Sequence, residues 1–126
     1  MSEKLVEEWI SKAEEDFRSM EELYRISVSE FANTICFHAQ QCAEKYLKAL
    51  LTKYGIEPPW IHTLEALLDL LTEKNPALEE NRSMLAQLTP YGTEYRYPGK
   101  FATAEEAEDC YDIIIRFRKN VQEFIK

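Results

Sequence analysis

Apolar side chains recur at helical spacing along three long segments of the chain. An apolar residue falls at every fourth position from Leu5 to Phe17, and the opposite side of this segment is strongly acidic. Residues 30–54 carry a second apolar face that ends before Gly55, and the residues after Thr103 repeat apolar side chains at spacings of three and four. Such spacings place side chains on one face of an α-helix. The sequence therefore predicts three long amphipathic helices.

Two shorter helices are predicted between the second and the last long helix. Thr63 is a good N-cap residue for a helix with leucines over residues 64–71. Asn75 followed by Pro76 is a cap and first-turn signal for a short helix that runs to about residue 88. The aromatic-rich stretch over residues 91–101 is predicted to be a loop.

Two pairs of residues have the spacing of a capping box, in which a Ser or Thr and a Glu three positions later satisfy each other's backbone N–H groups. Ser27 and Glu30 precede the second long helix, and Thr103 and Glu106 precede the last one. No segment alternates apolar and polar residues between turns as a strand does. We therefore expect an all-α fold, an antiparallel up-and-down bundle of four main helices plus a short extra helix.

Composition and charge narrow the class of protein. A length of 126 residues suits one helical domain over residues 1–126. The chain has 23 acidic side chains against 15 basic ones, a net charge of −8. Binding to duplex DNA relies on cationic side chains that neutralise phosphates, so we expect no duplex DNA as a partner. The net charge does not exclude a local cluster of basic side chains that binds a ligand.

The apolar runs are too short for a membrane span, since the longest are three residues, such as 113–115, against about 20 needed. The first residues lack the basic and then apolar pattern of a signal peptide. The three cysteines, Cys36, Cys42 and Cys110, have no CxxC spacing. We interpret them as reduced core thiols. We therefore expect a cytoplasmic protein without a membrane segment.

The second long helix carries a polar strip beside its apolar face. On a helical wheel, His38, Gln41, Lys45 and Lys48 fall within one arc of about 80°. One interpretation is a solvated face on which Lys45 pairs with Gln41 or Glu44. The other is a site for a phosphate or a carboxylate, because two Lys, a His and a Gln supply hydrogen-bond donors and positive charge.

The aromatic-rich stretch over residues 91–101 contains a second candidate binding site, the segment Tyr95-Arg96-Tyr97-Pro98. The Arg96 guanidinium offers a planar fork of donors that suits a phosphate, and the flanking tyrosines can stack on a base. The alternative is a loop that tucks its aromatic rings under the bundle while Arg96 pairs with a Glu.

Other sequence motifs of phosphate-binding, hydrolytic or metal-binding sites are absent from the sequence. It has no Gly-rich phosphate loop, GxSxG or HExxH motif, and His38 and His62 lack metal-ligand partners at helical spacing. No metal or cofactor is therefore predicted. The carboxylates over residues 14–16 and 105–106 are interpreted as solvated. Trp9 is expected in the core, and Trp60 is expected to be a packing lid or a contact residue.

The stretch Phe37-His-Ala-Gln-Gln-Cys-Ala-Glu-Lys-Tyr-Leu-Lys-Ala-Leu-Leu51 resembles the signature helix of HEPN domains. Other pieces of the chain resemble the family in the same order. These pieces are Trp9, Ala13 and Asp16-Phe17 in the opening helix, His62-Thr63-Leu64, the turn Arg96-Tyr97-Pro98, and the long closing helix. The resemblance covers nearly the whole chain.

The resemblance implies a helical bundle that forms a homodimer. It also implies a minimal nucleotidyltransferase as partner, often within a toxin–antitoxin system. Active family members are metal-independent ribonucleases whose motif is an Arg followed, after four to six residues, by a His. Here Phe101 stands where a His could complete that spacing after Arg96, and no Arg in the chain is followed by a His at that distance. Phe cannot transfer a proton, which metal-free RNA cleavage requires.

The sequence thus predicts a non-catalytic HEPN binding module that holds a nucleotide or RNA phosphate. The predicted binding residues are Gln41, Lys45, Lys48, Arg96, Tyr97 and His38. One alternative is a divergent metal-independent ribonuclease toxin that uses Arg96 and Tyr97 with His38 recruited from the second helix. Another is a structural or antitoxin-like subunit without a ligand.

Overall fold

A computed structural model describes residues 2–126, and within them every regular element is a helix. The α-helices are α1 (Ser2–Ile26), α2 (Ala32–Lys53), α3 (Leu64–Thr72), α4 (Arg82–Leu88), α5 (Pro90–Thr93) and α6 (Ala104–Ile125). Two short 3₁₀ helices are η1 (Pro76–Asn81) and η2 (Glu94–Arg96). The predicted all-α fold is confirmed. None of the helices described is long and apolar enough to cross a membrane.

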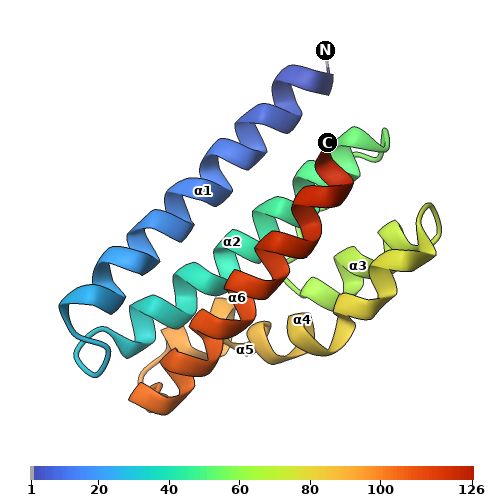
Figure 1. The fold of residues 1–126 in the computed structure, drawn as a ribbon. Coiled ribbons are helices and arrows are strands. Elements are labelled where there is room, and N and C mark those ends of the chain that lie inside the picture. The colour runs from blue at the N-terminus through green and yellow to red at the C-terminus, as the bar shows by residue number, and fades with distance from the viewer. Residues whose placement is uncertain (1) are drawn as a thin grey trace.

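Helix α2 lies at the centre of the bundle, with α1 running antiparallel along one side and α6 along another (Figure 1). Helices α2 and α6 run in the same direction. Their C-terminal ends meet where Lys53 Nζ donates to the carbonyl oxygens of Phe124, Ile125 and Lys126 at 2.8, 2.9 and 2.7 Å. The chain returns between them through the short helices α3, α4 and α5.

The central position of α2 follows from its residues. Fifteen of its 22 residues are buried, including four polar ones: Gln40, Glu44, Lys48 and Thr52. The solvated interpretation of the polar strip is wrong for Lys48, which is buried, whereas His38, Gln41 and Lys45 are partly exposed. Each buried polar group needs a partner inside the protein. No buried side-chain nitrogen or oxygen within residues 2–126 lacks a hydrogen bond.

The hydrogen bonds at the starts of the helices show which of the predicted capping residues act as caps. Thr103 Oγ1 accepts from the backbone N–H of Glu106 at 3.1 Å, and Glu106 Oε1 accepts from that of Thr103 at 2.9 Å. The second predicted capping box is confirmed. Asn75 also caps as predicted, since its Oδ1 accepts from the backbone N–H of Ala77 at 3.2 Å. The helix that follows Asn75 starts as the 3₁₀ helix η1 and becomes α-helical only in α4.

Three local predictions are wrong. Ser27 Oγ does accept from the backbone N–H of Glu30 at 3.2 Å, but in a turn, because α2 begins at Ala32 without a side-chain cap. Residues 90–96 are helical turns rather than loop. Trp9 lies outside the core and is only half-buried; Lys48 Nζ of α2 lies 5.7 Å from the centroid of its ring.

The cysteines match their interpretation as core residues. Cys36, Cys42 and Cys110 are buried and none is in a disulfide. Burial raises the pKa of the Cys42 thiol, which keeps it protonated at neutral pH. These thiols therefore act as small apolar side chains.

Candidate functional site

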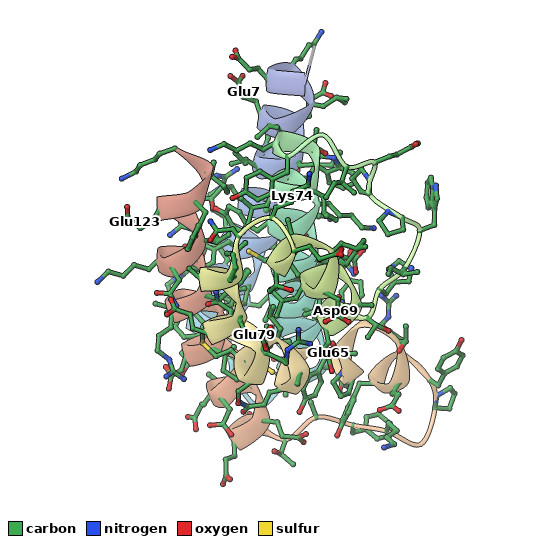
Figure 2. All side chains as sticks on the ribbon, turned by 90° about the vertical axis from the view of Figure 1, so that its right-hand side faces the viewer. Glu7, Glu65, Asp69, Lys74, Glu79 and Glu123 are labelled. Carbon is green, nitrogen blue, oxygen red and sulfur yellow. The ribbon has the colours of Figure 1, made fainter. Side chains whose placement is uncertain are left out.

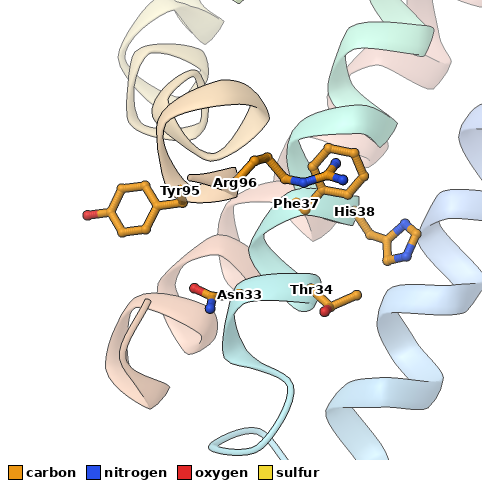
Figure 3. A pocket seen from close by; sticks show the side chains of 6 residues that line it. All are labelled: Asn33, Thr34, Phe37, His38, Tyr95 and Arg96. Atoms are coloured by element: carbon orange, nitrogen blue, oxygen red, sulfur yellow. The ribbon is translucent and has the colours of Figure 1, made fainter. Parts of the chain in front are cut away.

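A pocket of about 340 Å³ opens between the first turns of α2 and the 3₁₀ helix η2 (Figure 3). It brings together two predicted site residues from distant parts of the chain, His38 and Arg96. We call it the His38–Arg96 pocket. Its lining consists of Asn33, Thr34, Phe37, His38, Tyr95 and Arg96.

The His38 ring is held by a carboxylate of the neighbouring helix. His38 Nδ1 lies 2.8 Å from Asp16 Oδ1 on α1. An ionised carboxylate only accepts hydrogen bonds, so this contact assigns a proton to Nδ1. Nε2 is then the ring nitrogen left for a ligand, as donor or acceptor according to the protonation state.

Asp16 is 8% exposed and has a second partner, Lys45, whose Nζ lies 2.6 Å from Asp16 Oδ2. Burial raises the pKa of Asp16, but the hydrogen bonds from His38 and Lys45 outweigh burial and lower the pKa below its usual value of 3.8. Asp16 is therefore ionised at neutral pH. The predicted pairing of Lys45 with Gln41 or Glu44 is wrong. The solvated interpretation of residues 14–16 is wrong for Glu14 and Asp16, which have partners on α6 and α2, but fits the exposed Glu15.

Arg96 is exposed and makes no ion pair within residues 2–126. Its guanidinium carbon lies 4.0 Å from the centroid of the Phe37 ring. Figure 3 shows the guanidinium extending over Phe37 toward the side of the pocket where His38 lies. The predicted alternative of an Arg96–Glu pair is wrong. Stacking on Phe37 presents the planar donors at the pocket without neutralising their charge.

The two tyrosines of the Tyr95-Arg96-Tyr97 segment have different surroundings. Tyr95 OH donates to Glu106 Oε2 at 3.0 Å, and Tyr91 OH donates to the same oxygen at 2.5 Å. These bonds anchor α5 and η2 to the first turn of α6. Tyr97 is 70% exposed and does not line the pocket. The structure therefore brings Arg96, but not Tyr97, to His38.

The remaining residues of the polar strip have other partners. Gln41 Nε2 donates to Gln40 Oε1 at 2.8 Å. Lys48 is 6% exposed and donates to Glu44 Oε2 at 3.0 Å. Glu44 also accepts from Gln40 Nε2 at 3.1 Å and contacts His62 Nδ1 at 3.0 Å.

We call Gln40, Glu44, Lys48 and His62 the Glu44 cluster. It gives much of the signature sequence of α2 a structural role. The cluster joins α2 to the segment before α3, since Gln40 Nε2 also lies 3.2 Å from the carbonyl oxygen of His62. Lys48 is consequently separated from the His38–Arg96 pocket.

Helix α5 packs tightly against this cluster at Gly92. A Cβ atom at position 92 would lie 2.5 Å from Gln40 Cδ. Gly92→Ala is therefore expected to destabilise the protein by about 1–2 kcal/mol, because the buried Gln40 has to move. Urea unfolding measures the change. In an uncrowded helix the same substitution stabilises by about 1 kcal/mol, so a gain in stability contradicts the close packing. Thr93→Ala, at the exposed next position, is the matched control.

Sequence reasoning missed most of the residues that shape the pocket. Asp16, Asn33, Thr34 and Phe37 are not among the predicted site residues. Asp16 had a signal, since it is among the residues that resemble the family in the opening helix. Asn33 has a structural role as well, because its Oδ1 accepts from the backbone N–H of Ala102 at 2.5 Å.

The bundle and its signature helix define the class of protein. Residues 6–124 match the model of the HEPN domain. The chain therefore belongs to the HEPN domain family. A curated relative from Methanocaldococcus jannaschii, named "Putative toxin MJ1304", is 30% identical, and the match covers 94% of this chain and 84% of the relative.

Two solved structures share the fold. An archaeal HEPN homologue, ST0689, is 30% identical with a TM-score of 0.76, and the match covers 96% of this chain and 98% of that one. TT1696 from Thermus thermophilus is 25% identical with a TM-score of 0.78, and the match covers 94% of this chain and 96% of that one. The similarity in each case extends over nearly the full bundle.

Proposed function

We propose that this HEPN protein binds the phosphate of a nucleotide or RNA in the His38–Arg96 pocket and has a toxin-like role. The supporting observation is the stacked Arg96 guanidinium, which has no ion pair within the described residues, in one pocket with a His38 ring fixed by Asp16. An Arg fork binds phosphate oxygens in a bidentate manner, and the His38 Nε2 group supplies a further hydrogen bond.

The other predicted residues have secondary parts in this proposal. Lys45 acts through Asp16, which it helps to keep ionised and in place for His38. Gln41 is partly exposed on the same helix face, and Tyr97 is exposed beside Arg96, so both are proposed as contacts for parts of a ligand beyond its first phosphate.

The proposed partners follow from the family. We propose a cytoplasmic homodimer that acts with a minimal nucleotidyltransferase as a toxin–antitoxin pair, and the name of the M. jannaschii relative supports the toxin-like role. The net charge of −8 favours a partner with a basic surface over long nucleic acid duplexes.

Calorimetric titration of nucleotide-free protein with nucleotides and a short RNA tests phosphate binding. Wild-type protein is expected to bind at least one of them near 1 μM, about −8 kcal/mol. Arg96→Ala and His38→Ala are each expected to weaken binding at least tenfold, about 1.4 kcal/mol. Arg116→Ala, an exposed arginine on α6, is the control and leaves the affinity unchanged. Folded protein that binds none of the ligands contradicts the proposal and leaves a structural or antitoxin-like subunit.

The Asp16–His38 contact favours a second candidate function, metal-independent RNA cleavage. A His whose Nδ1 donates to a carboxylate has the orientation and tautomer of a general base acting through Nε2. Phe101, exposed and outside the pocket lining, supplies no such group. Cleavage of RNA in the presence of a metal chelator, abolished in His38→Ala and reduced in the positioning variant Asp16→Asn, supports this candidate. Intact RNA after prolonged incubation contradicts it.

A further inference from the structure

A second pocket, of about 630 Å³, lies at the C-terminal end of α2. We call it the Trp60 pocket. The first turns of α1 form one wall, and the segment that follows α2 forms the other. Most of the side chains that line it are apolar, among them Leu5, Trp9, Ile56 and Trp60. The volume falls in the range of ligand pockets, about 300–1,000 Å³, so the pocket has room for several side chains of a partner.

Trp60 is the most exposed large apolar side chain described, with 97% of its surface accessible. Leu5, on the opposite wall, is half exposed. An indole that is almost fully exposed to water buries no apolar area, so Trp60 does not act as a packing lid. The other role that the sequence allowed, a contact residue, fits an accessible ring at the rim of an apolar pocket.

The apolar surface extends along α1 beyond the Trp60 pocket. A neighbouring hollow of about 190 Å³ shares Leu5 and Trp9 with it and is completed by Glu8 and Lys12. Leu5 and Lys12 are seven residues apart, which is a rise of about 10 Å along a helix. Figure 2 shows the first turns of α1, where Glu7 is labelled, projecting beyond the ends of α2 and α6. An elongated, accessible apolar surface suits a peptide segment better than a compact small molecule.

Two charged side chains line the Trp60 pocket, and only one of them is compensated. Lys48 is 6% exposed, and its Nζ donates to Glu44 Oε2 at 3.0 Å, so its charge is neutralised inside the protein. Glu57 is exposed and makes no ion pair within residues 2–126. The free charge that the pocket offers to a partner is therefore negative.

The surroundings of the pocket keep this sign. Thr52 and Gly55 bring the C-terminal end of α2 into the lining, and a helix C-terminus carries a partial negative charge. Lys53 lies in the same turn, but its ammonium group donates to the carbonyl oxygens at the end of α6. In the neighbouring hollow the charges of Glu8 and Lys12 are opposite and offset each other.

We infer that the Trp60 pocket docks a protein partner through an amphipathic segment that carries an arginine among apolar side chains. The apolar side chains enter the pocket between Leu5 and Ile56, and the guanidinium stacks on Trp60 and pairs with Glu57. A guanidinium suits this place because it is planar, weakly hydrated and able to stack on an indole while it donates to a carboxylate. The net charge of −8 attracts such a basic segment. The inference is independent of phosphate binding, because the His38–Arg96 pocket shares no residue with this one.

The test uses two synthetic peptides of about 12 residues, about 18 Å long as a helix. One carries leucines at spacings of three and four with arginines between them. In the other each arginine is replaced by citrulline, which has a similar shape and no charge. Calorimetric titration is expected to show that wild-type protein binds the arginine peptide roughly tenfold more tightly than the citrulline peptide. Trp60→Ala and Glu57→Gln are each expected to remove most of this preference, whereas Trp60→Phe keeps part of it because a ring remains.

Two matched variants separate the pocket from the rest of the surface. Ile115→Ala removes an exposed apolar side chain on α6, and Glu73→Gln removes an exposed carboxylate after α3. Both are expected to bind the two peptides as wild-type protein does. Because Trp60 and Glu57 are exposed, unchanged melting temperatures of their variants are expected and confirm folding.

A spectroscopic measurement locates the contact. The chain has two tryptophans, so Trp9→Phe leaves Trp60 as the single indole, whose emission the arginine peptide is expected to change. Equal affinity for the two peptides, or full affinity in Trp60→Ala, reveals only a general attraction of basic peptides and overturns the inference. Folded protein that does not bind the arginine peptide overturns it as well. If a hexanucleotide RNA binds instead and is lost in Trp60→Ala, the surface belongs to nucleic acid. Trp60→Ala is expected to keep the phosphate affinity of the wild type, so either proposal can fail without the other.

Discussion

Replacing Glu44 with alanine is expected to lower the free energy of unfolding by about 3–5 kcal/mol. The carboxylate is almost fully buried and accepts hydrogen bonds from Gln40, Lys48 and His62. Its removal leaves the Lys48 ammonium buried without a counter-charge and opens a void between α2 and the segment before α3. An unpaired buried charge is among the most destabilising defects a single substitution produces.

Urea unfolding of three variants measures this effect. Glu44→Ala gives the cost of the unpaired lysine, and Glu44→Leu/Lys48→Met replaces the pair with apolar side chains of similar size. The double variant is expected to be more stable than Glu44→Ala, because no charge remains buried. Glu73→Ala, an exposed carboxylate after α3, is the control and changes stability by less than about 0.5 kcal/mol. A Glu44→Ala protein as stable as this control contradicts the structural role of the cluster.

Replacing Glu14 with alanine is expected to cost about 2–4 kcal/mol. Glu14 links α1 to α6, since Arg118 Nε and Nη2 donate to its two oxygens at 2.7 and 2.6 Å. The buried Tyr46 OH also donates to Glu14, and the Arg118 guanidinium lies 4.2 Å from the Phe17 ring centroid. Alanine leaves a buried hydroxyl without its acceptor, which accounts for most of the loss. Tyr46→Phe in the Glu14→Ala background is expected to recover part of it.

The same carboxylate makes stability depend on pH in a defined direction. The hydrogen bonds from Arg118, the strongest influence, and from Tyr46 lower the pKa of Glu14 below its usual value of 4.5, against the effect of burial. A lowered pKa contributes stability that is full above about pH 4.5 and is lost as the pH falls through the lowered value. Wild-type unfolding midpoints are therefore expected to fall more steeply than those of Glu14→Ala in this range. Parallel pH profiles contradict the assignment.

The long helices could be predicted because their apolar residues recur at a regular period and burial against neighbours reinforces that period. The return of the chain between α2 and α6 could not be predicted in detail. Residues 90–96 are short helical turns held by contacts such as Tyr91 and Tyr95 to Glu106, and no local pattern encodes those contacts. The spacing of Trp9 fits the apolar stripe of α1 and so predicts a core position, yet spacing does not reveal how fully the neighbouring helices bury each turn of α1.

Of the candidate binding site, the sequence could predict only which residues share one face of α2. The spacing of His38 and Lys45 puts them together on the polar strip, and the resemblance to a known family adds Arg96. Helical spacing cannot show which carboxylate of a neighbouring helix faces a cationic side chain. Asp16 is one of several acidic residues on α1, and only the packing of α1 against α2 singles it out as the partner of both His38 and Lys45.

The parallel arrangement of α2 and α6 has a consequence for how this architecture diversifies. Parallel neighbours cannot be joined by a tight turn, so the chain must cross the full length of the bundle between them (Figure 1). The crossing contributes Tyr95 and Arg96 to the His38–Arg96 pocket, whereas α2 contributes Asn33, Thr34, Phe37 and His38. One wall of the pocket is thereby separated from the three long helices that carry most of the core. Mutations in the crossing can change the ligand during evolution while the scaffold is kept.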